Sequence, residues 1–368
     1  MADLSSCYYS PDKLAVLLLA GLDGVSLRKK MAVLSIFENL SDLIFNLREF
    51  KAEVVRVIGE DGFFAMSERL NALSLEAEKL EKAGVEILTI RDAEYPEKLR
   101  NIPDPPVMLF LAGNIKLLNT PSIAVVGTRK PSRYAVKVTE QFAREFARAG
   151  LTVVSGLARG IDTVAHKTAL AENGATAAVL GSGLDVIYPS ENTGLFNAIL
   201  SSGGLALSEY PLGAKPQQYH FPERNRIVSG LSEAVFLPEA GERSGSLNTV
   251  SHALEQGRQP FIVPSTINNP FSAGSNNLLR DMQGAIALEP DDVLKAFGLS
   301  SKPSEKKHVQ LDFTSAKITA KIEEEGEMHF EELLAFSGLG VQELTAVLME
   351  LELSGVIEKL SGNYFGPA

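Results

Sequence analysis

The chain has 368 residues, of which 45% are hydrophobic, and this length exceeds what one hydrophobic core usually organises, so we expect two or three domains. It contains one cysteine, Cys7, which excludes an intramolecular disulfide and a thiolate metal cluster. The five histidines are scattered and form no HExxH pair, so the sequence predicts no metal and no cofactor. The formal net charge of −11 argues against a nucleic-acid partner, because Lys and Arg neutralise phosphates in such complexes.

The charge is, however, unevenly distributed along the chain. Residues 121–230 hold eleven Lys and Arg against eight Asp and Glu, a net of +3, whereas residues 313–368 hold three against ten, a net of −7. An anionic partner would therefore meet the middle of the chain.

No segment is typical of export or of a membrane span. The apolar stretch from Leu14 to Ala20 is short, follows Asp12, and lacks a basic region and a cleavage site. The longest charge-free stretch, residues 259–279, contains three prolines and many polar residues, so it cannot cross a bilayer as a helix. We expect a cytoplasmic protein that has no membrane partner.

Residues 1–72 are predicted to form a small helical domain. Apolar residues recur every three or four positions from Pro11 to about Leu70, and Asp23-Gly24 breaks the first two helices. This placement is found in SAM-like and helix-hairpin-helix modules, although short helical bundles in general share it.

Residues 73–299 are predicted to form an α/β core with an extended Rossmann-like parallel sheet. A helix up to Ala83 comes first, and short apolar strands then alternate with amphipathic helices, which indicates parallel strands covered on both faces. The predicted strands are 85–90, 107–113, 123–127, 151–156, 175–181, 234–240 and 259–264, and the main predicted helices are 133–149, 163–173, 194–201 and 247–256.

The last part of the chain is predicted to be a linker, residues 300–311, followed by a winged-helix domain, residues 312–368. A helix, the turn Ser337 to Gly340, a second helix and two short strands follow in the order of a winged helix. The second helix, residues 341–353, carries three glutamates and no Lys or Arg, so phosphates would repel it. We expect this domain to contact protein or to pack, and not to bind DNA.

Two loops after predicted strands contain arginines. Gly127 and Arg129 follow the strand at 123–127, where a doubly wound sheet binds its ligands, although Arg129 could equally be a solvated loop residue. Arg159 lies between two glycines after the next strand and could point at a ligand. His166 is one helical turn further on, and a buried, hydrogen-bonded histidine is the more common alternative to a titrating one.

Nucleotide-binding motifs are incomplete. Gly181-Ser182-Gly183 lacks the third glycine and the acidic partner of a dinucleotide site, and no GxxxxGK[ST] occurs in the chain, so neither NAD nor ATP is predicted as a cofactor.

The segment from His220 to Ser232, preceded by Lys215, combines a ring with cations. It contains Phe221, Arg224, Asn225 and Arg226, which together offer base stacking and phosphate neutralisation for a single strand. The alternative is a loop in which Phe221 belongs to the core and the arginines pair with carboxylates.

A strand-to-helix turn further on offers hydroxyl groups to a phosphate. Ser244, Gly245 and Ser246 lie on this turn, after Glu239 and Arg243. The turn is not a GxSxG elbow, and Glu239 has no evident partner that would tune it as a general base. The sequence therefore predicts a binding surface without catalytic residues.

Seven motifs resemble the DNA-processing protein A (DprA/Smf) family in order and spacing. They cover about residues 85–290 and read DAEYPEKLRNIPDPP, AVVGTRKPSRYA, VVSGLARGIDTVAHKTAL, GSGLDVIYP, FPERNRIVSGLS, EAGERSGSLNTVSHAL and AGSNNLLRDMQGA. The resemblance implies an extended Rossmann fold, a homodimer formed through it, single-stranded DNA bound in a basic pocket, and loading of the RecA recombinase during natural transformation.

Carried over by motif, the resemblance implies a pocket lined by Gly127, Arg129, Arg159, Phe221, Arg224, Asn225, Arg226, Ser244, Gly245 and Ser246, with Lys215 a weaker candidate. Two alternatives use the same fold. One is a nucleotide phosphoribohydrolase-like enzyme, whose PGGxGTxxE mark is missing from PEAGERSGSLNTV, and the other is a sensor of small nucleotides.

Overall fold

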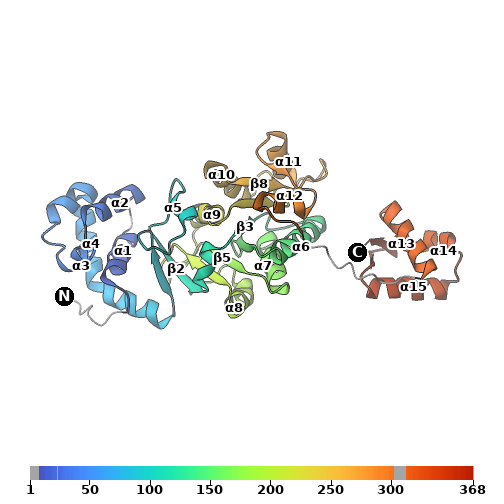
Figure 1. Ribbon diagram of the computed structural model, residues 1–368, viewed down its shortest axis with the longest axis horizontal. Helices are drawn as coiled ribbons and strands as arrows, with labels where there is room; N and C mark the ends of the chain where they lie inside the picture. Colours follow the sequence, from blue (N-terminus) through green and yellow to red (C-terminus); the bar gives the residue numbers. More distant parts are fainter. Residues whose placement is uncertain (1–7, 23, 302–311, 368) are drawn as a thin grey trace. The chain divides into compact units, whose positions relative to one another are not determined.

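The computed structural model describes residues 8–22, 24–301 and 312–367, which form two compact units divided near residue 302. Figure 1 shows the elements of both units. The predicted linker lies outside the described residues from position 302 onward, as does Asp23 of the predicted helix break.

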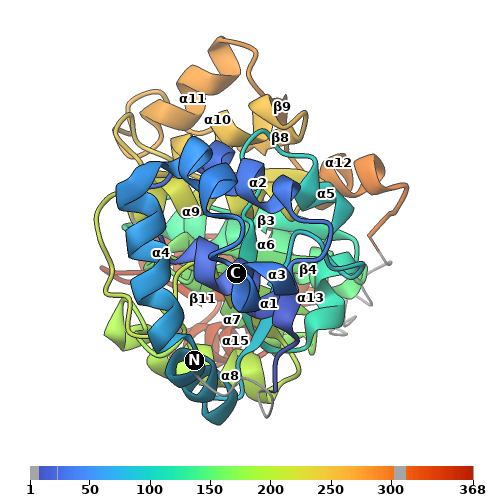
Figure 2. The ribbon, with the colours of Figure 1, turned by 90° about the vertical axis from the view of Figure 1, so that its left-hand side faces the viewer.

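The first unit begins with helices that share a core with the edge of a large sheet. They are α1 (Pro11–Ala20), α2 (Leu27–Ile36), α3 (Ser41–Phe45) and α4 (Lys51–Lys82). Leu14 to Leu19 of α1 are buried against each other and against Ile87 and Phe110 of the sheet, which explains the apolar run in the sequence. Figure 2 shows these helices from their outer side. Residue 72 lies inside α4, and the division of this unit into a helical domain and an α/β core stays a prediction.

Nine strands form the sheet of this unit, in the order β1-β2-β6-β5-β4-β3-β7-β8-β9. Neighbouring strands from β6 to β9 are parallel, whereas β1 and β2 are antiparallel to their neighbours. The strands are β1 (Glu86–Thr89), β2 (Met108–Gly113), β3 (Ser122–Val125), β4 (Thr152–Ser155), β5 (Thr176–Leu180), β6 (Leu205–Ser208), β7 (Ala234–Leu237), β8 (Gln259–Ile262) and β9 (Ala285–Ile286).

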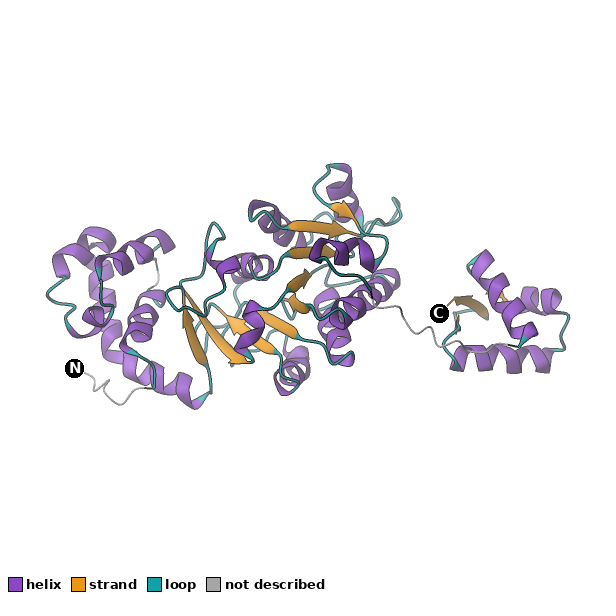
Figure 3. Ribbon diagram, viewed as in Figure 1, coloured by secondary structure: helices purple, strands orange, loops and turns teal. Residues whose placement is uncertain are grey.

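Helices cover both faces of the sheet, as Figure 3 shows. They are α5 (Glu97–Arg100), α6 (Arg133–Arg148), α7 (Ile161–Ala171), α8 (Thr193–Ser201), α9 (His220–Gly230), α10 (Ser246–Glu255), α11 (Ala273–Arg280) and α12 (Pro290–Leu294), with short 3-10 turns η1 (Ile115–Asn119), η2 (Ser190–Asn192) and η3 (Lys295–Phe297). Alternate residues of β3 point to opposite faces: Ile123 packs with α6 and α7, and Ala124 packs with α5, α9 and α10. This two-sided burial explains why the strands are apolar throughout and confirms the predicted fold class.

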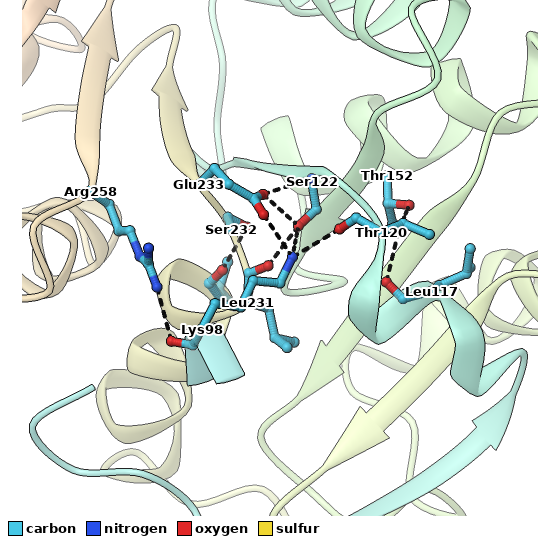
Figure 4. Close-up of polar contacts among 10 residues, drawn as sticks. Lys98, Leu117, Thr120, Ser122, Thr152, Leu231, Ser232, Glu233 and Arg258 are labelled. Atoms are coloured by element: carbon cyan, nitrogen blue, oxygen red, sulfur yellow. Dashed lines mark hydrogen bonds and ion pairs between the residues drawn. The ribbon is translucent and has the colours of Figure 1, made fainter. Parts of the chain in front are cut away.

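A polar cluster fixes α5 to the amino ends of the central strands (Figure 4). The Lys98 ammonium donates to Thr120 O and Ser122 Oγ at 2.9 and 2.8 Å and pairs with Glu233 at 3.2 Å. Glu233 also accepts from the Ser122 amide at 2.8 Å. Burial lowers the pKa of Lys98, and the contact with Glu233 opposes this shift. The cluster lies at the edge of the sheet opposite to the loops discussed below.

The second unit is a winged helix. Its elements are α13 (Phe313–Glu325), β10 (Met328–His329), α14 (Phe330–Ser337), α15 (Val341–Leu353), β11 (Ile357–Lys359) and β12 (Tyr364–Pro367), with β12 between β10 and β11. A core that includes Ile322, Leu333, Leu348 and Phe365 holds the helices on the strands. Within the described residues no single helix is long and apolar enough to cross a membrane, and the one pair that passes when joined, α14 with α15, is bent by 110°.

Candidate nucleic-acid interface

The parallel part of the sheet changes its winding direction between β3 and β7. The chain runs from β3 outward through β4 and β5 on one side and through β7, β8 and β9 on the other. Loops from the carboxyl ends of β3 and β7 therefore separate and leave a crevice, which is where open α/β sheets bind ligands.

A cavity of about 1120 Å³ occupies this crevice. Eight of the eleven predicted site residues line it, namely Gly127, Arg129, Phe221, Arg224, Asn225, Ser244, Gly245 and Ser246. These residues come from the loops after β3 and β7, from α9 and from the first residue of α10, so the fold brings together segments that are more than a hundred positions apart in the sequence.

Arg129 is an exposed cation of the β3 loop. Its guanidinium carbon lies 5.4 Å from the centre of the Phe221 ring, in a cation–π contact. The Phe221 ring is also 5.5 Å from the ring of Tyr188. Since the ring contact orients the Arg129 side chain without neutralising it, the guanidinium remains available to an anion.

Arg224 is an almost fully buried part of the cavity lining, and its guanidinium contacts backbone. It is 4% exposed, and it donates to the carbonyl oxygens of Gly156, at 2.7 Å, and Val179. Burial lowers the pKa of Arg224 to about 10, so the guanidinium stays charged, and Asp162 opposes this shift. A Cβ at position 156 would collide with this guanidinium, which explains the glycine there. Arg224 thus joins the loop that follows β4 to the carboxyl end of strand β5.

Arg226 lies outside the cavity, on the other side of α9. It pairs with Glu209 at 2.6 Å and with Asp104 at 3.1 Å, and it is 9% exposed. The sequence alternative in which arginines pair with carboxylates therefore describes Arg226.

Arg159 and Lys215 are at or beyond the rim. Arg159 lines a small adjoining cavity together with Arg129 and Tyr188, and it forms a two-pronged ion pair with Glu191 at 2.7 and 2.8 Å. Lys215 is an exposed loop residue that lines none of the cavities found among the described residues.

The serines after β7 lie at the start of α10. Ser244 Oγ and Ser246 Oγ are 2.8 Å apart, and the Asn225 amide donates to Gly245 O at 3.2 Å. Hydroxyl groups at the positive end of a helix dipole favour an anion. The turn therefore adds a second part of the cavity lining that attracts anions, besides the loop that carries Arg129.

Several residues that the sequence did not assign to the site also line the cavity, and among them are two cations and two aromatic rings. Lys130 and Arg243 are exposed cations, and Tyr188 and Phe271 are rings exposed to 42% and 52%. Three of them, Lys130, Tyr188 and Arg243, belong to the motifs that carry the family resemblance. Their position in these motifs could have identified them as site residues. No pattern in the sequence distinguishes Phe271, because its loop has no regular periodicity.

Glu239 and His166, the acidic and histidine side chains that the sequence singled out near the site, have structural contacts. Glu239 is 1% exposed and accepts hydrogen bonds from the amide and the hydroxyl of Ser132, both at 2.8 Å. His166 is buried, its Nδ1 is 2.7 Å from Thr176 Oγ1, and burial lowers its pKa to about 3. Of the two alternatives that the sequence left open, a titrating histidine and a buried, hydrogen-bonded one, His166 is therefore the second. No group of three His, Cys, Asp or Glu able to hold a metal occurs among the described residues.

The fold and cavity define a doubly wound α/β protein that has an anion-attracting crevice at its switch point and carries a winged-helix domain. The comparisons with known proteins specify it further. Residues 86–298 match the family model described as DNA recombination-mediator protein A, and residues 302–363 match the DprA winged helix domain. The chain belongs to the DNA recombination-mediator protein A (DprA/Smf) family.

Relatives with substantial similarity support this assignment. The chain is 39% identical over 302 residues to Protein Smf of Escherichia coli, covering 77% of this chain and 78% of that one, and 44% identical over 210 residues to DNA processing protein DprA of Streptococcus pneumoniae, covering 57% and 73%. The solved structure of DprA from S. pneumoniae matches with a TM-score of 0.67 at 36% identity, covering 77% of this chain and 97% of that one. A structure of DNA processing protein A from Helicobacter pylori, whose subject is a single-stranded DNA binding mode, matches with a TM-score of 0.51 at 32% identity, covering 58% and 95%.

Proposed function

We propose that this chain binds single-stranded DNA in the crevice between β3 and β7. The observation that carries the proposal is the convergence of the exposed cations Arg129, Lys130 and Arg243 with exposed rings around one cavity. Cations neutralise the phosphate backbone and rings stack on unpaired bases, and proteins that bind single strands combine these two features. The relative from H. pylori, a protein described as binding single-stranded DNA, supports the proposal.

The proposed site residues have two different roles. Gly127, Arg129, Phe221, Asn225, Ser244, Gly245 and Ser246 contact the strand, and Arg224 holds the loops beneath it. Arg159 contributes at the rim when a phosphate replaces Glu191 as its partner. Arg226 and Lys215 do not contact the bound strand in this proposal, because neither lines the cavity.

Binding serves DNA uptake and recombination in this proposal. The chain protects incoming single strands in the cytoplasm and loads the RecA recombinase onto them during natural transformation, as the family resemblance implies. The site acts by binding and not by catalysis, since Glu239 and His166, the groups nearest to acid–base chemistry, are engaged in buried structural contacts.

A homodimer formed through the α/β core completes the proposal. The outer strand β9 has one free edge, and Met282, Ile286 and Leu288 beside it are exposed to 92%, 56% and 72%. An exposed apolar sheet edge is a surface that proteins usually cover. A second copy of the chain covers it here.

One titration tests the binding activity. The logarithm of the binding constant for oligo-dT should fall linearly with the logarithm of the salt concentration, because binding releases counterions from the phosphates. AMP, titrated in the same salt series, should bind far more weakly because it offers one phosphate and one base. Tight binding of AMP with no preference for the oligonucleotide would instead support a small-nucleotide sensor, and hydrolysis of AMP would support the phosphoribohydrolase alternative.

A further inference from the structure

A second cavity, of about 640 Å³, adjoins the DNA crevice. Ser132, Tyr134, Pro264, Ser265, Thr266 and Asn269 line it. None of these residues lines the first cavity. In two segments of the chain, however, residues that line the first cavity lie next to residues that line the second. Lys130 comes two residues before Ser132, and Pro270 follows Asn269.

A buried carboxylate fixes the wall that the two cavities share. Glu239 accepts hydrogen bonds from Ser132, from Asn269 Nδ2 at 3.3 Å and from Ser272 Oγ at 3.2 Å. One side chain thereby joins the loop before α6 to the loop that carries Phe271. These hydrogen bonds hold the wall in which Asn269 lines the second cavity and Phe271 lines the first.

The second cavity offers the same kinds of groups as the first. Tyr134 is 50% exposed at the start of α6, and the hydroxyl of Thr266 and the amide of Asn269 lie beside it. Exposed Arg133 separates Ser132 from Tyr134 in the sequence, so Arg129, Lys130 and Arg133 form a run of cations from one cavity to the other. Within the part of the chain that the structure describes, none of these three forms an ion pair with a carboxylate.

We propose that this second cavity is a further nucleotide subsite, in which Tyr134 stacks a base of the strand that continues out of the crevice. The inference rests on the proposed function. Phosphates of the continuing strand follow the cations of the β3 loop, and the unpaired base beyond them enters the cavity next to the ring. Stacking on an aromatic ring tolerates any base, so the subsite extends the length of the bound strand without adding sequence specificity.

The length of the oligonucleotide separates the two cavities. We expect Tyr134→Leu to weaken the binding of an oligo-dT of about sixteen nucleotides at least about fivefold, the lower end of the loss for one base stack. An oligo-dT of about four nucleotides, which fills only the first cavity, should bind the variant and the wild type equally. Tyr134→Phe should restore full affinity for the long strand, because it keeps the ring.

Phe64→Leu is the matched control, since Phe64 is 67% exposed on α4 and lines none of these cavities. Equal affinity of wild type and Tyr134→Leu for the long strand would overturn the subsite. An equal loss for both lengths would also overturn it, because Tyr134 would then act on the first cavity. If the wild type bound neither length, the proposed function itself would fail.

Discussion

Arginine side chains that the sequence assigned to the same site have different roles because of their burial. Arg129 is exposed with only an aromatic ring beside it, whereas Arg224 donates to two carbonyl oxygens in the interior. An exposed guanidinium can exchange water for phosphate, but a buried one that already satisfies two acceptors cannot leave them without cost. Residue type and spacing did not separate these roles.

The difference in burial predicts that the two alanine substitutions change the free energy of unfolding by different amounts. Arg224→Ala should lower the free energy of unfolding by about 3 kcal/mol or more, because it leaves buried Asp162 and two carbonyl groups without their cation. Arg129→Ala should change it by less than about 0.5 kcal/mol, since its side chain is exposed. Urea unfolding of both variants measures this. If Arg224→Ala unfolded at the same urea concentration as the wild type, Arg224 would not hold the loops, and it would have to be counted among the residues that contact the ligand.

At the scale of elements, the apolar strands and the amphipathic helices of the core were predictable because two-sided burial leaves a continuous apolar run. The strands β3, β4, β5, β7 and β8 begin and end within three residues of their predicted bounds. The segment that contains Arg224 forms α9, and the sequence did not predict this helix. Its inward face is half polar, which hides the helical period. Strand β6 was not predicted; it lies between two glycines, Gly203 and Gly204, and a loop.

The candidate site was predictable where residues stand next to a strand end, as with Gly127, Arg129 and the three residues at the start of α10. It was not predictable where the outcome depends on tertiary packing. Arg226 has the same sequence neighbours as Arg224, and only the approach of Asp104 and Glu209 from distant loops removes it from the cavity.

The contact between α7 and the strands beneath it predicts a pH effect. His166 is held by Thr176 of β5, which in turn donates to Val153 O of β4 at 2.7 Å. Burial lowers the pKa of His166 from 6.5 to about 3, so the unfolded chain takes up a proton that the folded chain excludes. The resulting loss of stability begins as pH falls below the unfolded pKa and continues down to the folded pKa.

Between about pH 7 and about pH 5 this proton uptake should cost about 2 kcal/mol of unfolding free energy. His166→Asn, which keeps a polar atom near Thr176 and does not titrate, should lose correspondingly less over the same interval. Urea titrations of both proteins at the two pH values give the difference. Parallel losses in wild type and variant would show that His166 is not the responsible group.

At the scale of the whole molecule, the acidic character of the chain belongs largely to a different unit from the crevice in which we propose that DNA binds. Helix α15 exposes Met349 and Leu353 to 63% and 84% and carries Glu343, Glu350 and Glu352 without Lys or Arg. A surface of this kind suits a protein contact and repels phosphate, so we retain the hypothesis that the winged helix does not bind DNA.

Truncation tests this hypothesis. A chain that ends near Ser300 keeps the first compact unit and loses an acidic domain, so its affinity for oligo-dT should be unchanged or higher. Fluorescence anisotropy at several salt concentrations measures the affinity. The truncated protein should unfold at the same midpoint as the core of the full chain, which shows that it is folded. If such a protein lost most of its affinity for oligo-dT, the winged helix would belong to the DNA site.

The central claim is that phosphates are neutralised in the crevice between β3 and β7, and the salt dependence of oligo-dT binding by Arg129→Ala tests it most directly. Removing one phosphate contact should weaken binding at low salt and reduce the slope of log affinity against log salt by about 0.7. Arg226→Lys, outside the cavity, provides the comparison and should keep the wild-type slope. An Arg129→Ala protein with wild-type affinity and wild-type slope would contradict the proposed location of the DNA site.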